Sequence, residues 1–218
     1  MLIKAVVFDM DGVIFDSERC IFDVWKDLAR QHNLGDMEPA LRACLGVNTE
    51  TCRKIMRSMK GEDFPVEAFM KEASALFHAR YDGGKLPLKP GVRELLGFLK
   101  EKGIRVGLAS STKESTVTAE LRDAGLYDFF DQIVCGNMVT KSKPDPEIFL
   151  TACRLLDVEP GDAFAIEDSF NGIRSASSGG LRALMVPDMV EPTEEIRALC
   201  EKVLPSLTDV QAYFETLA

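Results

Sequence analysis

The sequence has few of the features that mark membrane or secreted proteins. Its apolar runs are no longer than a strand, as in Ala5-Val6-Val7-Phe8, whereas a membrane helix needs about 20 apolar residues. Asp9 interrupts this first run before it reaches the length of a signal-peptide core. We therefore expect no membrane segment, no membrane partner and a cytoplasmic location.

Positive charge and metal-binding sulfur are also scarce. Lys and Arg number 26 against 35 Asp and Glu, a net charge of −9, so the chain lacks the basic balance of a nucleic-acid-binding protein. Six cysteines are scattered without a C-x-x-C pair, and two histidines cannot complete a typical zinc site. Isolated reduced thiols in a protein core explain such cysteines. We expect no nucleic-acid partner.

The 218 residues are 46% apolar and 28% charged, which is an ordinary soluble composition. Buried-strand patterns recur along the chain, and most of them end in a polar cluster; they cover residues 2–8, 103–109, 131–135, 163–166 and 182–186. Between them lie segments with helical periodicity, such as Val92, Leu95, Leu96 and Leu99. This alternation predicts an α/β fold, a Rossmann-like parallel sheet with helices on both faces.

One long segment interrupts the alternation. Residues 17–82 contain no strand-like run, but residues 50–60 and the apolar face of residues 66–77 have helical periodicity. We therefore predict a core domain of residues 1–16 and 83–218 with an inserted helical cap domain of residues 17–82.

Two acidic pairs follow predicted strands, Asp9 with Asp11 and Glu167 with Asp168. Ligands of parallel sheets bind at the carboxyl ends of the strands, and Mg²⁺ prefers hard oxygen ligands. An Asp pair in a loop is also common turn chemistry. The two matching pairs leave a metal site and a structural turn as equal alternatives.

Two serines and a lysine also lie in polar segments between the predicted strands and helices. Ser110 and Ser111 come after a strand, where hydroxyls and amides at a helix N-terminus can hold a phosphate or merely cap the helix. Lys143 precedes a helix and the fourth strand. In one interpretation, Lys143 neutralises a carboxylate and a phosphoryl group. In the other, it is a solvent-exposed lysine in a loop.

In this order the motifs resemble the haloacid dehalogenase superfamily. Asp9-Met10-Asp11-Gly12-Val13 is similar to its first motif, Ser110 to its second, Lys143 to its third and Glu167-Asp168 to its fourth. The stretches 143–149 (KPDPEIF) and 166–172 (IEDSFNG) resemble the beta-phosphoglucomutase/phosphatase branch. The helical insertion lies where this family has a small helical cap. The resemblance extends from about residue 3 to residue 187.

The resemblance implies a Mg²⁺-dependent phosphatase that acts on a small phosphorylated metabolite. Asp9 would attack phosphorus to form an aspartyl-phosphate, and Asp11 would serve as acid and then as base. The metal ligands would be Asp9, the Asp11 carbonyl and Asp168, with Glu167 in support. Ser110, Ser111 and neighbouring amides would hold the phosphoryl group, and Lys143 would offset the negative charge. We expect a monomer.

Three alternatives remain. A dehalogenase is disfavoured because Asp11 is present, and a non-enzymatic binding module is disfavoured because all the motif residues are intact. A sugar-phosphate mutase of the same branch is the main alternative. The mutases have a histidine where this chain has Ile21. They also have an arginine where this chain has Thr49, and that arginine binds the second phosphate.

Two further features of the predicted cap bear on the choice. Arg42 or Arg53 could replace the missing arginine. The stretch Gly46-Val47-Asn48-Thr49 is a candidate substrate-facing loop or a simple helix connector.

Overall fold

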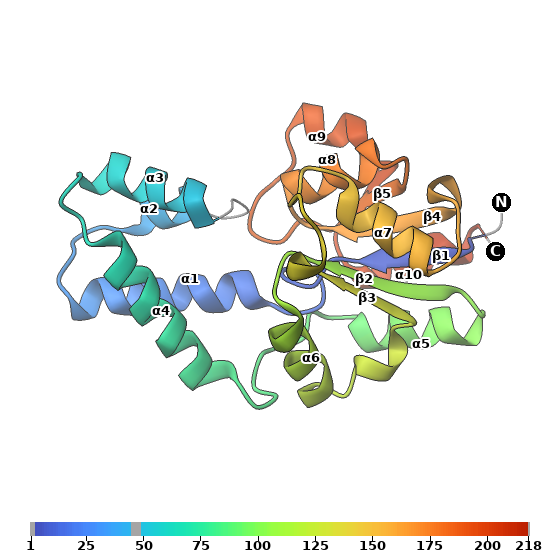
Figure 1. The fold of residues 1–218 in the computed structure, drawn as a ribbon, viewed down its shortest axis with the longest axis horizontal. Helices are drawn as coiled ribbons and strands as arrows, with labels where there is room; N and C mark the ends of the chain where they lie inside the picture. The colour runs from blue at the N-terminus through green and yellow to red at the C-terminus, as the bar shows by residue number, and fades with distance from the viewer. Residues whose placement is uncertain (1–2, 45–48, 218) are drawn as a thin grey trace. The chain divides into compact units, whose positions relative to one another are not determined.

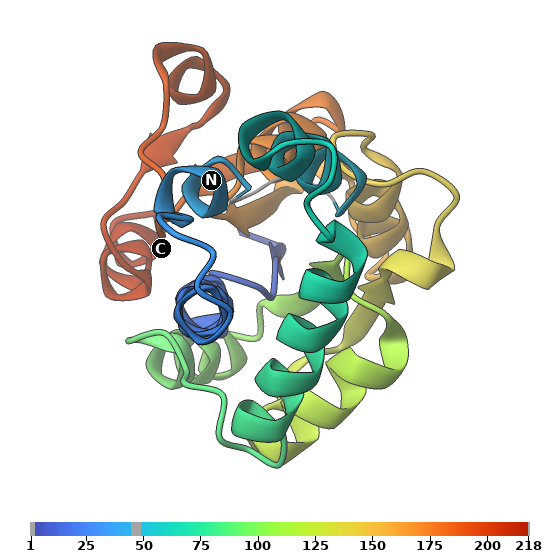
Figure 2. The same cartoon turned by 90° about the vertical axis from the view of Figure 1, so that its left-hand side faces the viewer.

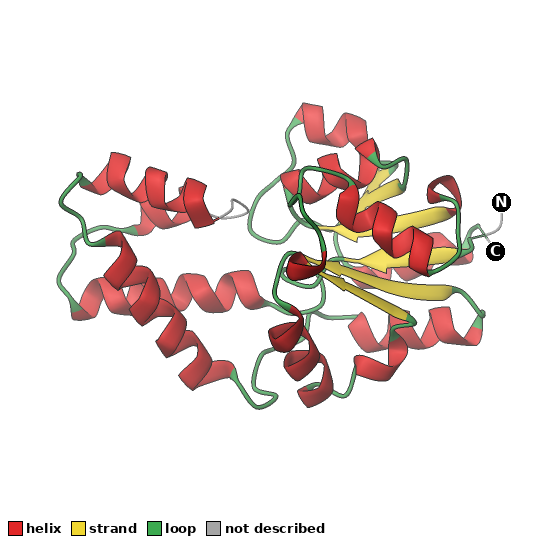
Figure 3. Ribbon diagram, viewed as in Figure 1, coloured by secondary structure: helices red, strands yellow, loops and turns green. Residues whose placement is uncertain are grey.

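The computed structural model describes residues 3–44 and 49–217. The chain divides into two compact units, one of Met1–Asp16 with Pro87–Ala218 and one of Ser17–Leu86. Figure 3 shows that the strands belong to the first unit and that the second is built from helices. Among the described helices, none combines the length and the apolar character needed to cross a bilayer.

The first unit contains a six-stranded sheet in the order β3-β2-β1-β4-β5-β6, with every neighbouring pair parallel. The strands are β1 Ala5–Phe8, β2 Arg105–Ser110, β3 Gln132–Cys135, β4 Ala163–Glu167, β5 Arg182–Met185 and β6 Lys202–Val203. The central strands are apolar on both faces because helices cover both sides. The predicted Rossmann-like α/β fold is confirmed. Strand β6 was not predicted, because two residues carry no periodicity.

Helices cover the two faces of the sheet (Figure 1). On one face, α7 (Glu147–Leu155) and α8 (Phe170–Ser178) pack on alternate strand residues such as Val7 and Ala165. On the other, α10 (Leu207–Glu215) brings Phe214 to 5.0 Å from the Phe164 ring centroid and packs beside α5 (Val92–Glu101). The remaining elements of this unit are α6 Glu114–Asp123, α9 Glu194–Leu199 and the short 3-10 helices η1 Tyr127–Phe129, η2 Gly136–Met138 and η3 Pro160–Asp162.

The second unit consists of α1 (Ser17–Gln31), α2 (Glu38–Ala43), α3 (Thr49–Lys60) and α4 (Val66–Tyr81). Helix α1 packs against α4, and α2 packs against α3; Figure 2 shows α1, in blue, almost end-on. The predicted helical segments at 50–60 and 66–77 correspond to α3 and α4. Of the predicted substrate-facing loop, Gly46, Val47 and Asn48 lie outside the described residues, as does the Thr49 side chain.

Candidate active site

The register of the sheet brings the first and fourth predicted motifs together. Phe8 of β1 is aligned with Leu108 of β2 and with Ile166 of β4. The backbone N–H of Asp9 then donates to the Ile166 carbonyl at 2.9 Å. Because the three strands run in parallel, the polar residues that end or follow them meet at one edge of the sheet.

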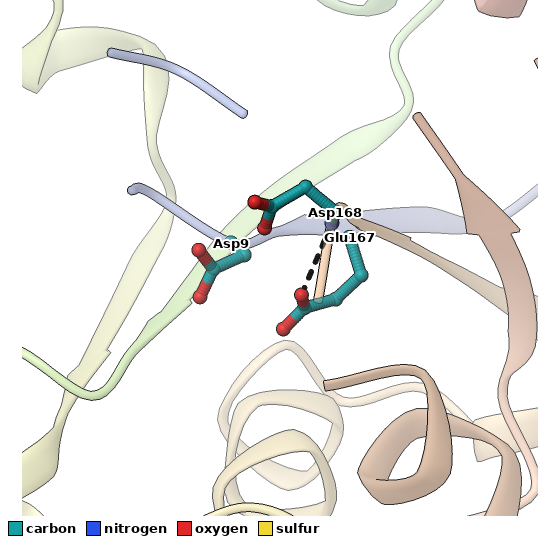
Figure 4. A group of neighbouring side chains, drawn as sticks. All are labelled: Asp9, Glu167 and Asp168. Atoms are coloured by element: carbon teal, nitrogen blue, oxygen red, sulfur yellow. Dashed lines mark hydrogen bonds between the residues drawn. The ribbon is translucent and has the colours of Figure 1, made fainter. Parts of the chain in front are cut away.

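Three carboxylates converge at this edge. One oxygen each from Asp9, Glu167 and Asp168 lies within 4.8 Å of the others, and Figure 4 shows the three side chains next to one another. Asp9 is 7% exposed and Glu167 is fully buried. Carboxylates this close repel one another when they are ionised, so their arrangement requires a compensating positive charge.

Lys143 supplies that charge. Its Nζ donates to Asp9 Oδ1 at 2.5 Å, to Glu167 Oε1 at 2.6 Å and to the Ala109 carbonyl at 2.8 Å. An ammonium group has three N–H donors, and each has an acceptor here. The side chain is buried, so the alternative of a solvated loop lysine is wrong.

Burial and the charges of this cluster together shift two pKa values. Burial raises the pKa of Asp9 well above its ordinary value; Lys143 lowers it in part, and Glu167 and Asp11 raise it further. Burial alone would lower the pKa of Lys143, but the adjoining Asp9 and Glu167 carboxylates raise it above its ordinary value. The lysine is therefore charged throughout the neutral range.

The second carboxylate oxygen of Glu167 also accepts hydrogen bonds. Oε2 accepts from the backbone N–H groups of Asp168 and Ser169 at 3.2 Å and from Ser169 Oγ at 3.0 Å. Ser169 Oγ in turn accepts from the Gly172 N–H and caps α8. A Cβ atom at Gly172 would overlap the Glu167 carboxylate. Glu167 thus lies in a close-fitting, fully hydrogen-bonded pocket.

The remaining predicted residues lie at the end of β2. Ser110 is its last residue and is fully buried, and its Oγ accepts from the Thr112 N–H at 3.0 Å. Thr112 Oγ1 donates to Asp11 Oδ2 at 2.9 Å. The N-cap residue of α6 is Lys113, so the alternative in which Ser110 caps this helix is wrong. Ser111 lies between these residues with an exposed side chain.

Three residues of this arrangement were not predicted to contribute to the site: Thr112, Ser169 and Gly172. Ser169 had a legible signal, because a serine directly before a helical segment is a common N-cap. Gly172 ends the stretch 166–172 that resembles the family, but nothing local indicates its contact with Glu167. Thr112 had no signal, since its importance depends on a residue that is distant in the chain.

The donor set fits a divalent cation of the Mg²⁺ type. Carboxylate oxygens are the ligands that this hard cation prefers. Both Glu167 oxygens accept hydrogen bonds, and Asp9 accepts one from Lys143 through Oδ1; Asp9 and Asp168 provide the other two carboxylates of the group. The three carboxylates together therefore offer the oxygen donors that such a cation requires.

The chain is similar to several known proteins along most of its length. The chain is 35% identical over 182 residues to a phosphorylated carbohydrates phosphatase of Thermotoga maritima, with 83% of each chain covered. It is 35% identical over 194 residues to a beta-phosphoglucomutase of Bacillus subtilis, covering 84% of this chain and 83% of the relative. The crystal structure of CbbY from Rhodobacter sphaeroides in complex with phosphate aligns with a TM-score of 0.75 at 28% identity, covering 96% of both chains.

The family model for haloacid dehalogenase-like hydrolases matches residues 3–180, which include all the motif residues placed at the sheet edge. The resemblance noted in the sequence is therefore confirmed: the chain belongs to the haloacid dehalogenase-like hydrolases, in the branch that contains beta-phosphoglucomutases and sugar-phosphate phosphatases.

Proposed function

We propose that this protein is a Mg²⁺-dependent phosphatase that hydrolyses a small phosphorylated metabolite through an aspartyl-phosphate on Asp9. The observation that carries the proposal is the buried contact of Asp9 with Lys143, beside Glu167 and Asp168. A carboxylate at the end of a central strand, held by a cation, is oriented for nucleophilic attack. We further propose that the predicted cap of residues 17–82, which lies within the unit Ser17–Leu86, selects the substrate.

The reaction has two steps. In the first, an Asp9 carboxylate oxygen bonds to phosphorus while the bond from phosphorus to the leaving oxygen breaks, and Asp11 gives that oxygen a proton. In the second, water attacks phosphorus, Asp11 takes a proton from the water, and the bond from phosphorus to Asp9 breaks. Phosphate and free Asp9 carboxylate are released. Asp11 thus acts as the acid and then as the base.

Other residues stabilise charge in these steps. Lys143 holds Asp9 in place and reduces the repulsion between the carboxylates and an anionic substrate. Ser110, Ser111 and the amides at the end of β2 hold the phosphoryl oxygens. A bound Mg²⁺, held by Asp9, Asp168 and the Asp11 carbonyl, would neutralise the charge on these oxygens.

The substrate class we propose is a sugar or sugar-alcohol phosphate. The curated relatives include a phosphatase of phosphorylated carbohydrates and, at 30% identity over 218 residues, hexitol phosphatase B of Escherichia coli. Both names describe small hydroxylated substrates that carry a phosphate ester.

A sugar-phosphate mutase is the second candidate, because one relative is named beta-phosphoglucomutase. A mutase must hold a second phosphate. The chain has Ile21 and Thr49 at the positions of the mutase histidine and arginine, and loss of an Arg–phosphate contact costs roughly 1.5–3 kcal/mol. The two candidate substitutes already have carboxylate partners: Arg42 Nε donates to Glu38 at 2.9 Å, and Arg53 lies 3.5 Å from Glu50. Exposed pairs of this kind are weak, so it is the missing histidine and arginine that favour hydrolysis.

A panel of phosphate esters tests the proposal. We expect Mg²⁺-dependent release of phosphate from sugar and sugar-alcohol phosphates, abolished by EDTA and restored by added Mg²⁺. Asp9→Asn should reduce turnover at least about a thousandfold, because an amide cannot accept the phosphoryl group. Residual turnover above that level, in a preparation free of other phosphatases, would contradict Asp9 as the nucleophile.

A second assay separates the two candidates. The enzyme is supplied with beta-glucose 1-phosphate and a trace of the 1,6-bisphosphate, and both glucose 6-phosphate and free phosphate are followed. A phosphatase releases phosphate. Efficient isomerisation with little phosphate release would establish the mutase instead.

A further inference from the structure

A hydroxyl group that neither the motifs nor the comparisons assign contacts the proposed acid/base residue. Thr112 Oγ1 lies 2.9 Å from Asp11 Oδ2, across 101 positions of the chain. The two residues belong to the connections that follow β2 and β1, which are neighbouring strands. A hydroxyl that donates to an ionised carboxylate forms a charge-assisted hydrogen bond. A protonated carboxyl group keeps an oxygen that accepts, so the bond to Oδ2 persists when Oδ1 carries the proton.

Thr112 is itself held on both sides of its backbone. Its N–H donates to Ser110 Oγ at 3.0 Å, and its carbonyl accepts from the Gly136 N–H at 3.0 Å. Ser110 is fully buried. Gly136 follows β3, and a Cβ atom there would overlap the Ser111 carbonyl. The Thr112 hydroxyl therefore projects from a loop that is fixed by the ends of two strands.

We propose that Thr112 is a positioning residue, which orients the Asp11 carboxylate for proton transfer and does not itself hold the phosphoryl group. This inference rests on the proposed role of Asp11 as acid and base. An aspartate side chain has two rotatable bonds, and one hydrogen bond from a fixed donor to Oδ2 restricts both of them. Small errors in the placement of a catalytic group are costly in rate.

The consequence depends on the leaving group. When the bond from phosphorus to the leaving oxygen breaks, an alkoxide needs the proton of Asp11, because alkoxides are strongly basic. The p-nitrophenolate ion is stable and leaves without that proton. Protonation by a positioned acid contributes about a hundredfold or more to such steps. A loss of Asp11 orientation should therefore slow alkyl phosphate esters and spare p-nitrophenyl phosphate.

The test compares kcat/KM for a sugar phosphate and for p-nitrophenyl phosphate, since kcat/KM reports only the steps up to transfer of the phosphoryl group to Asp9. For Thr112→Val we expect a loss of about tenfold with the sugar phosphate and less than about twofold with p-nitrophenyl phosphate. Thr112→Ser keeps the hydroxyl and should restore most of the loss. Thr118→Val, the same change further along α6, is the matched control and should alter neither value.

Asp11→Asn is the reference variant, with an expected loss of about a hundredfold for the sugar phosphate and a much smaller one for the aryl ester. Equal losses on both esters in Thr112→Val, beside a selective loss in Asp11→Asn, would show that Thr112 binds the phosphoryl group and would overturn the inference alone. No leaving-group selectivity in Asp11→Asn would overturn the acid/base role together with the inference. Thermal unfolding of each variant identifies a loss of activity that comes from misfolding. If Thr112→Val misfolds, the inference is tested with Thr112→Ser, which should keep the wild-type ratio of the two kcat/KM values; a changed ratio in a folded Thr112→Ser would contradict it.

Discussion

The Lys143 ammonium group donates to Glu167 Oε1 at 2.6 Å, and the two side chains are 7% and 1% exposed. These residues come from different parts of the fold: Lys143 lies in the connection after β3, and Glu167 ends β4. A buried charge that loses its partner is left without hydration or compensation. This pair therefore supports both the stability of the core and the geometry of the site.

We expect Lys143→Ala to impair stability and activity together. Removal of one partner of a buried ion pair typically costs about 3–5 kcal/mol, measured here as the free energy of unfolding in urea. The loss of a cation at a charged transition state should lower kcat/KM about a hundredfold or more. Lys143→Arg should rescue poorly, because a planar guanidinium cannot reproduce the three-way contact of the ammonium group. A kinetically silent Lys143→Ala would remove this residue from the mechanism.

Asp168→Ala should raise the Mg²⁺ concentration needed for activity. Even indirect supports of a metal typically contribute about 10- to 100-fold to its affinity, and we propose Asp168 as a direct ligand. Activity is measured as a function of added Mg²⁺ after treatment with EDTA. Glu101→Ala, which removes an exposed carboxylate at the end of α5, serves as control and should leave the Mg²⁺ requirement unchanged. An unchanged requirement in Asp168→Ala would exclude it as a ligand.

Gly172→Ala should damage the site through a single methyl group. A Cβ atom at this position would overlap the Glu167 carboxylate, so Glu167 must move away from Lys143 and Ser169. Overpacking of this kind costs roughly 1–3 kcal/mol, and activity should fall with it. Gly97→Ala in α5 is the matched control, because nothing lies within 4 Å of its added Cβ; there the substitution should stabilise the helix by about 0.5–1 kcal/mol. Wild-type activity in Gly172→Ala would show that the Glu167 position is not critical.

The buried thiols should make the protein less stable at alkaline pH. Burial raises the pKa of Cys135 and of Cys153 from 9.0 to about 11. Above pH 9 the unfolded chain loses these protons while the folded chain keeps them. The stabilisation is therefore complete below pH 9 and declines as the pH rises through about 11, by about 1 kcal/mol per thiol at pH 10.

Urea unfolding at pH 8 and at pH 10 measures this effect. The double variant Cys135→Ala/Cys153→Ala should lose less stability between the two pH values than the wild-type protein does. Its enzymatic activity should be unchanged, because neither thiol contacts the carboxylate cluster through a hydrogen bond in the described structure. Equal losses in the two proteins would show that these thiols do not ionise differently in the folded and unfolded states.

Local sequence was sufficient for the elements whose patterns are long or end in a characteristic residue. The run that ends at Asp9 and the run that ends at Glu167 were legible as buried strands, because a parallel strand covered on both faces is continuously apolar. Strand β6 was not legible, since Lys202 and Val203 form a strand only by pairing with β5.

The sequence alone determined the order of the motifs, and with it the family and the expected acidic site at the strand ends. Only the tertiary structure decided what each residue contacts. Lys143 could have been a solvated loop residue, and nothing local distinguishes Thr112 from the other hydroxyls in its loop. Their partners, Glu167 and Asp11, are brought to them by the parallel pairing of strands that are distant in the chain. Such contacts depend on how several strands align at once, and no short stretch of sequence encodes that alignment.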